Sequence, residues 1–450
     1  MKSLRSLPCV IVLLGGMPAC SGSSGGKSSA DAASVPDHAV ITVAGDTPPA
    51  VVAYRDDTSS DWISVPVQGA TTLTLTMHGA YQVVVACDFS SQVAQDISIV
   101  VHGRTPRDDT AIGGCGGLPP FDVRGVLVQT GKIALGDSGV VTTSAANSPF
   151  DLTVEPGMFD LVMASLSADQ TPNGIAFRRD MVVDGDADLG SIDLTKEAIQ
   201  PVVPVSFKVA DLHPDEAAGF AARLIAGNTN ARLVTLDVTP NELTVGLLPD
   251  SALRPTDRQH VTMSAFTETA DANSLRYNRS LTRDAVRLGD PTSWVLPDRL
   301  SGVMFDLTAD RMTATWSTLP EYDDIELLRD GFRRNAQQSV DVRSHDMILS
   351  RAFVEATGAT SAALDLHAIP GFQSQWQLDP AADEDREFFV THHVSASEIA
   401  GAGVSSSSPD PATIAGTQSA SLSEQRMTRF ASGGSHRGSK ISPHALGRLH

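Results

Sequence analysis

The chain has 450 residues, of which 41% are hydrophobic and 19% are charged, so it can build two to four buried cores and is not a wholly disordered protein. Its 33 basic and 53 acidic side chains give a formal net charge of −20, which argues against a nucleic-acid partner because no basic field attracts phosphate. Aromatic residues are only 5% of the chain, too few to predict a surface of stacking platforms for sugars or bases.

The first nineteen residues have the layout of an export signal. Lys2 and Arg5 form a short basic segment, residues 10–14 (VIVLL) form an apolar segment, and small residues follow. The apolar run is far below the roughly 20 residues that span a bilayer, so it predicts a signal peptide over residues 1–19 rather than a membrane-spanning helix.

The run that ends this signal, residues 17–20 (MPAC), resembles a bacterial lipobox, although its first two positions depart from the family's usual Leu and Ala or Ser. The resemblance implies a lipoprotein in which Cys20 carries fatty acids such as palmitate. Ser21 in place of an inner-membrane retention Asp implies the outer membrane as the location in the cell envelope. Residues 20–35 are rich in Gly and Ser and predict a flexible tether. An ordinary secretory signal, with Cys20 as a spare thiol, is the alternative.

Two cysteines remain in the predicted mature body. Cys9 leaves with the signal, and Cys87 and Cys115 are an even pair in an oxidising compartment, which predicts a disulfide between them. Such a bridge closes a loop of about 28 residues and stabilises by about 3–4 kcal/mol in the loop-entropy description. Two unrelated buried thiols are the alternative. The absence of a CxxC pair gives no support for zinc or thioredoxin-like chemistry.

Short runs of Val, Ile and Thr separated by turn residues predict antiparallel strands through most of the chain. Residues 36–118 contain six such runs, among them 40–45 (VITVAG) and 81–87 (YQVVVAC), and are predicted to form a first β-sandwich. Residues 119–200 are predicted to form a second. The runs 154–165 (VEPGMFDLVMAS) and 178–194 are similar to carboxypeptidase regulatory-like, or transthyretin-like, β-sandwiches of bacterial surface proteins, a resemblance that implies fold and no activity.

Two further sandwiches and a tail complete the predicted order. Residues 201–300 are strand-like except for a short helix predicted at 215–222 (DEAAGFAA). Residues 301–403 begin with a segment that resembles the start of a fibronectin type III module, in which Trp316 would pack the core and Tyr322 would follow a Pro. Residues 404–450 are rich in Ser, Gly, Ala and Pro and predict a disordered C-terminal tail. The predicted fold class is therefore all-β, with tandem antiparallel β-sandwiches.

Two motifs suggest chemistry, but each lacks essential residues. Residues 136–139 (GDSG) resemble the segment around the catalytic serine of trypsin-like proteases, yet the chain lacks the family's histidine segment. Asp184, Asp186 and Asp188 are spaced as in a calcium loop, a weak metal-site candidate, since Leu189 and Thr195 replace the turn glycine and the bidentate glutamate. A solvated strand edge is the simpler interpretation of these three carboxylates. No catalytic residue and no cofactor are predicted.

These features predict an exported, lipid-anchored, non-enzymatic surface protein that displays β-sandwich modules for binding or structural roles. Its membrane contact would be the lipid, and a protein or polysaccharide partner is left open. One alternative is a carbohydrate- or polymer-binding accessory protein, which needs a line of exposed rings from its four tryptophans, Trp62, Trp294, Trp316 and Trp376. Another is a hydrolase with a non-standard site, which needs acids and histidine converging in a cleft.

Overall fold

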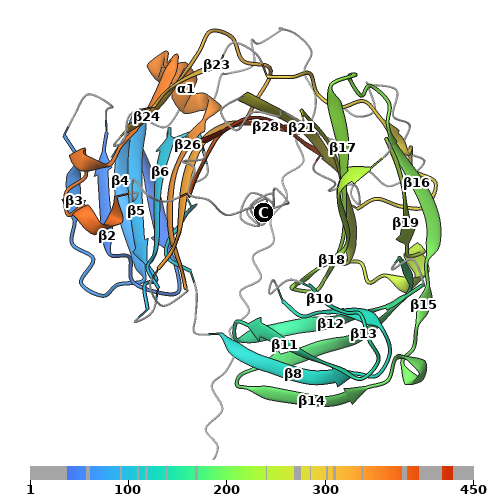
Figure 1. The fold of residues 1–450 in the computed structure, drawn as a ribbon. Coiled ribbons are helices and arrows are strands. Elements are labelled where there is room, and N and C mark those ends of the chain that lie inside the picture. The colour runs from blue at the N-terminus through green and yellow to red at the C-terminus, as the bar shows by residue number, and fades with distance from the viewer. Residues whose placement is uncertain are drawn as a thin grey trace, which may run out of the picture. The chain divides into compact units, whose positions relative to one another are not determined.

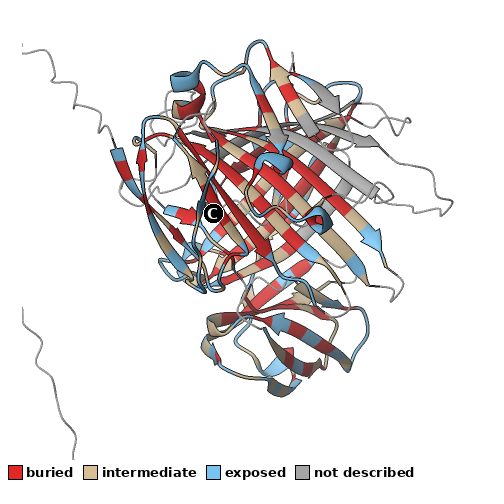
Figure 2. Cartoon of the chain, turned by 90° about the vertical axis from the view of Figure 1, so that its left-hand side faces the viewer, coloured by how far each residue is buried: buried red, intermediate tan, exposed pale blue. Residues whose placement is uncertain are grey.

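β-Strands form nearly all of the regular structure of the described chain (Figure 1). The computed structural model describes residues 418–428 and residues 38–394, the latter apart from 57–60, 92–93, 109–110, 117–119, 137–139, 168–170, 240, 268–274, 284, 301–302, 308–310, 336–338 and 378–382. Buried residues are concentrated on the strands, where in many strands they alternate with exposed or partly exposed ones (Figure 2). The all-β prediction is confirmed.

The first sandwich packs a three-stranded sheet, in the order β4-β1-β7, against strands β2 and β5. Strict alternation explains the pattern: β1 buries Ala39, Ile41 and Val43 and exposes the residues between them to varying degrees. The strands of this sandwich are β1 (His38–Ala44), β2 (Val51–Arg55), β3 (Ile63–Val65), β4 (Thr72–His78), β5 (Tyr81–Asp88), β6 (Asp96–Arg104) and β7 (Ala111–Gly113).

The second sandwich packs the sheet β11-β8-β14 against the sheet β10-β9-β12-β13-β15. Residues 154–165, which carry the regulatory-like resemblance, form the end of β11, a turn at Pro156 and most of β12. The elements are β8 (Phe121–Leu127), β9 (Gly131–Ala134), β10 (Val140–Thr143), β11 (Ser148–Val154), β12 (Gly157–Leu166), β13 (Pro172–Val183), β14 (Ala187–Ile192), η1 (Leu194–Lys196) and β15 (Gln200–Pro201).

The third sandwich packs the sheet β19-β16-β22 against β17, β20 and β21. The helix predicted at 215–222 is wrong, because this segment opens strand β17, which pairs with β18 on one side and β20 on the other. The elements are β16 (Val203–Val209), β17 (Glu216–Ala226), β18 (Thr229–Thr239), β19 (Glu242–Leu247), η2 (Asp250–Ala252), β20 (Arg258–Thr267), β21 (Leu275–Arg283) and β22 (Ser293–Trp294).

The fourth sandwich packs the sheet β23-β24-β27 against β25 and β26. Trp316 ends β24 in this core and Tyr322 is partly buried against it, as the fibronectin resemblance implies. The elements are β23 (Val303–Leu307), β24 (Arg311–Trp316), β25 (Asp324–Arg334), β26 (Val340–Ser350), α1 (Arg351–Thr357), β27 (Ser361–Asp365), η3 (Leu366–Ala368), η4 (Ser374–Trp376) and β28 (Asp383–Val394).

Edge-to-edge pairing joins three of the sandwiches into one 12-stranded sheet, in the order β18-β17-β20-β21-β29-β28-β25-β26-β6-β5-β2-β3. The first and fourth sandwiches meet at the parallel pair β6 and β26, whose register runs from Asp96 opposite Val342 to Gly103 opposite Leu349. Strand β29 (Gln418–Thr428) pairs with β21 and β28. It is the described part of the segment 404–450 for which a disordered tail was predicted.

Neighbouring sandwiches also share apolar cores. Strand β5 is buried on both faces: Val83 and Val85 point into the first sandwich, while Val84 and Ala86 point into the core of the fourth. A separate cluster joins the second and third sandwiches through residues such as Val162 and Leu224. Because residues 37–450 form one compact unit, the predicted boundaries before residues 119, 201 and 301 stay predictions.

Candidate functional site

The predicted disulfide is formed. Cys87 near the end of β5 and Cys115 are bonded, with their Cα atoms 5.5 Å apart, inside the usual range for a bridge. Both cysteines belong to the core of the first sandwich, and the carbonyl oxygen of Cys115 accepts hydrogen bonds from the backbone N–H groups of Asp46 and Thr47. The bridge therefore ties the last segment of the first sandwich to its central strand.

The candidate lipidation residue, Cys20, lies outside the described residues, as does the Ser138 of the protease-like motif. Among the described residues, no helix has the length and apolar character needed to span a bilayer.

Asp184 and Asp186 lie on the exposed turn between β13 and β14, and Asp188 is exposed on the edge strand β14. Asp186 accepts a hydrogen bond from the backbone N–H of Asp122 at 3.0 Å, and Asp188 accepts one from the backbone N–H of Gly190 at 2.8 Å. No group of three or more His, Cys, Asp or Glu side chains that could hold a metal ion occurs in the part of the chain that the structure describes. With Asp184 also exposed, the arrangement is that of a solvated edge.

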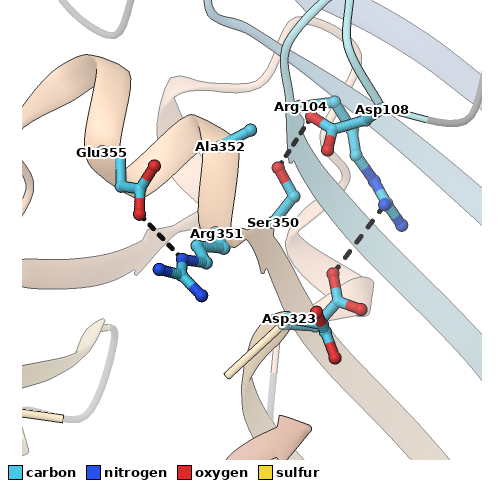
Figure 3. A pocket seen from close by; sticks show the side chains of 8 residues that line it. Arg104, Asp108, Asp323, Ser350, Arg351, Ala352 and Glu355 are labelled. Atoms are coloured by element: carbon cyan, nitrogen blue, oxygen red, sulfur yellow. Dashed lines mark hydrogen bonds and ion pairs between the residues drawn. The ribbon is translucent and has the colours of Figure 1, made fainter. Parts of the chain in front are cut away.

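A polar cleft of about 350 Å³ opens where the first and fourth sandwiches meet (Figure 3). One wall comes from the end of β6 and the turn that follows it, and the other from the start of β25, the end of β26 and the first turns of α1. The parallel pairing of β6 with β26 places these two walls side by side. The lining residues are Arg104, Asp108, Asp323, Asp324, Ser350, Arg351, Ala352 and Glu355.

A hydrogen-bonded bridge between the walls fixes the shape of this cleft. Asp108 Oδ2 accepts hydrogen bonds from the backbone N–H of Thr105 at 2.6 Å, from the Thr105 hydroxyl at 3.0 Å and from the Ser350 hydroxyl at 2.8 Å. The Ser350 oxygen in turn accepts a hydrogen bond from the backbone N–H of Phe353, which caps α1. Ser350 is 3% exposed, so its hydroxyl has a structural role and is not presented as a nucleophile.

The charges of the cleft are four carboxylates and two guanidinium groups. Arg351 donates to Glu355 one turn along α1, with 2.7 Å between Nε and Oε1, and this hydrogen bond raises the pKa of Arg351. Arg104 lies 3.8 Å from Asp324, measured from Nη1 to Oδ1, beyond hydrogen-bond range. The cleft therefore combines an acidic lining with one guanidinium that is only loosely paired.

None of the cleft residues was identified from the sequence as a site. The two sides of the Asp108–Ser350 hydrogen bond are 242 residues apart, and no local pattern connects them. The only local signals near the cleft are the two caps of α1: Ser350 is its N-cap, and Gly358 is its C-cap in the left-handed conformation.

The four tryptophans do not form an exposed platform. Trp294 and Trp376 are each 1% exposed, Trp316 is 7% exposed, and Trp62 is partly buried with the Arg55 guanidinium 4.6 Å from its ring centre. All four therefore stabilise cores or their margins. This gives no support for the polymer-binding alternative, which needs a line of exposed rings.

No protein-family pattern matches the chain, and no curated protein matches it. Among solved structures, one similar chain comes from the crystal structure of the chicken CNTN1 FN1-FN3 domains. The match covers 76% of this chain and 83% of that chain, with 9% sequence identity. The TM-score of 0.13 is too low to carry an argument. The assignment as an all-β chain of tandem sandwiches rests on the strands described above.

Proposed function

We propose that this chain is an exported, lipid-anchored, non-enzymatic protein of the bacterial cell envelope, which displays its β-sandwiches for binding. The sequence of residues 1–35, with its signal, its lipobox-like cysteine and its tether, motivates the proposal. An outer-membrane location follows from Ser21, in the position where a retention signal would carry Asp.

The Cys87–Cys115 disulfide is the observation that carries this proposal. Disulfides form and persist in exported proteins and are rare in reducing cytosol. The bridge belongs to the core of the first sandwich, so the body itself, and not only its N-terminal signal, suits an oxidising compartment.

The cleft favours binding over catalysis. Its one hydroxyl caps a helix, Asp108 Oδ2 already accepts three hydrogen bonds, and Glu355 is paired with Arg351. Among the described residues, the lining contains neither histidine, the most frequent general base, nor cysteine, a frequent nucleophile. A joint between modules is a common place for a ligand site.

Incorporation of labelled palmitate in a bacterial host tests the proposal. The full chain is expected to incorporate label, and Cys20→Ser is expected to abolish it. Cys9→Ser is the matched control, since it changes the other cysteine of the signal and leaves the lipid attachment residue intact. Equal labelling of the Cys20→Ser variant and the parent would refute lipid attachment at this residue.

A further inference from the structure

Two groups of opposite charge in the cleft have unused hydrogen-bonding capacity. The Arg104 side chain is 21% exposed, its buried Nε has no hydrogen-bond partner within the described part of the chain, and its Nη1 lies 3.8 Å from Asp324 Oδ1. A guanidinium has five N–H donors and suits a planar carboxylate. Arg104 is therefore available to a ligand that carries an anionic group.

Asp108 supplies the complementary charge on the same wall. All three of its side-chain hydrogen bonds go to Oδ2, from Thr105 and Ser350. Its Oδ1 has no hydrogen-bond donor among the described residues. Because Oδ2 is fixed by three hydrogen bonds, Oδ1 is held in a defined place, and the Asp108 and Arg104 side chains both line the cleft (Figure 3).

We propose that the cleft binds a free α-amino acid, with the ligand carboxylate on Arg104 and the ligand ammonium group on Asp108 Oδ1. The paired geometry of a guanidinium and a carboxylate makes the first contact directional, and the second is a charge-assisted hydrogen bond. This inference rests on the proposed binding role and gives it a ligand class.

The charge balance explains why both ligand charges are needed. A simple anion would be repelled by the four carboxylates of the lining, which outnumber its two guanidinium groups, and by the net charge of −20 of the whole chain. A simple cation would satisfy Asp108 and leave Arg104 loosely paired. A zwitterion matches both groups, and the volume of about 350 Å³ has room for the side chain of a small or medium amino acid.

Isothermal titration of the full chain with three related probes tests this. The probes are L-glutamine, N-acetyl-L-glutamine, which lacks the ammonium group, and L-glutaminamide, which lacks the carboxylate. We expect L-glutamine to bind and each derivative to bind about tenfold more weakly or worse, since each leaves one charged group unmatched. No binding of L-glutamine at millimolar concentration, or equal binding of all three probes, would overturn the proposal.

Variants test the residue assignment. Arg104→Gln and Asp108→Asn are each expected to weaken L-glutamine binding about tenfold, whereas Arg124→Gln, a 60% exposed arginine on β8, should leave binding unchanged. Unchanged binding in Arg104→Gln would contradict the assignment, and if a variant fails to fold, the three probes on the parent chain still decide. Palmitate labelling is independent of these titrations, so failure of the ligand proposal and failure of the anchor are distinguishable.

Discussion

Replacement of Glu216 by Gln is expected to destabilise the third sandwich strongly. The Glu216 side chain is fully buried and accepts hydrogen bonds from Arg279 Nη2 at 2.8 Å, from Arg299 Nε at 2.7 Å and from the backbone N–H of His213 at 3.0 Å. Arg279 is itself 1% exposed and also contacts Asp211. The substitution keeps the shape of the side chain and leaves a buried guanidinium without one of its two anions.

The size of the effect follows from the pKa of the carboxyl group. Burial raises the pKa of Glu216, but the hydrogen bonds from Arg279, His213 and Arg299 outweigh it and lower the pKa from 4.5 to about 2. At 1.36 kcal/mol per pKa unit, this difference corresponds to about 3 kcal/mol of stability at neutral pH. We expect the Glu216→Gln variant to lose about 2–3 kcal/mol.

The same pKa sets the pH range in which the parent chain loses folding stability. Because the folded-state pKa lies below the ordinary value, the stabilisation is complete above about pH 5 and declines as the pH falls from 4.5 towards 2. About 2 kcal/mol of this contribution is lost by pH 3.

Hydrogen exchange measured by mass spectrometry on peptides from β17 and β20 reports this local stability. At pH 7 the free energy of opening of these strands should be about 2–3 kcal/mol higher in the parent than in Glu216→Gln. This difference should become smaller as the pH falls towards 3. Asp250→Asn is the control, since Asp250 forms an exposed ion pair with Arg287 and should change stability by less than about 0.5 kcal/mol. A difference between parent and Glu216→Gln below about 1 kcal/mol at pH 7, or a difference that does not change with pH, would refute the role given to the Glu216 carboxylate.

Three further predictions concern the joint, the disulfide and the acidic turn. In Gly103→Ala the new Cβ would lie 2.6 Å from the Leu349 side chain, so thermal unfolding should show a loss of about 1–3 kcal/mol, and an unchanged midpoint would contradict the packing. Removal of the bridge in the double variant Cys87→Ala, Cys115→Ala should cost about 3–4 kcal/mol in urea denaturation; a loss under about 1 kcal/mol would contradict a stabilising role. A chelator should leave the midpoint unchanged, whereas a rise of several degrees with about 0.1 mM calcium, lost in Asp186→Asn, would make the turn a calcium site.

The strands could be predicted from the sequence because their burial alternates. In β1 the period of two is visible directly, since Ile41 and Val43 are buried while Val40 is exposed. Strand β17 shows where this reasoning fails. Gly219 and Ala221 are buried there as well as Ala218 and Phe220, so this run of small apolar residues shows no alternation and suggests a helix.

The joints and the cleft could not be predicted, because they depend on pairing between distant segments. Nothing in the sequence of β6 indicates that Ser98 will lie opposite Ser344, yet this register is what brings Asp108 to Ser350. Charged residues at the ends of strands are common on any surface. Their convergence in one cleft becomes visible only when both strands are placed.

Intact-mass measurement of the chain extracted in detergent from the envelope of the expressing bacterium tests the account most directly. We expect a chain that begins at Cys20, carries the mass of a diacylglycerol group and lacks two hydrogens because Cys87 and Cys115 are bonded. A chain found in the cytosol with its first residues intact, no added lipid and two alkylatable thiols at Cys87 and Cys115 would contradict it.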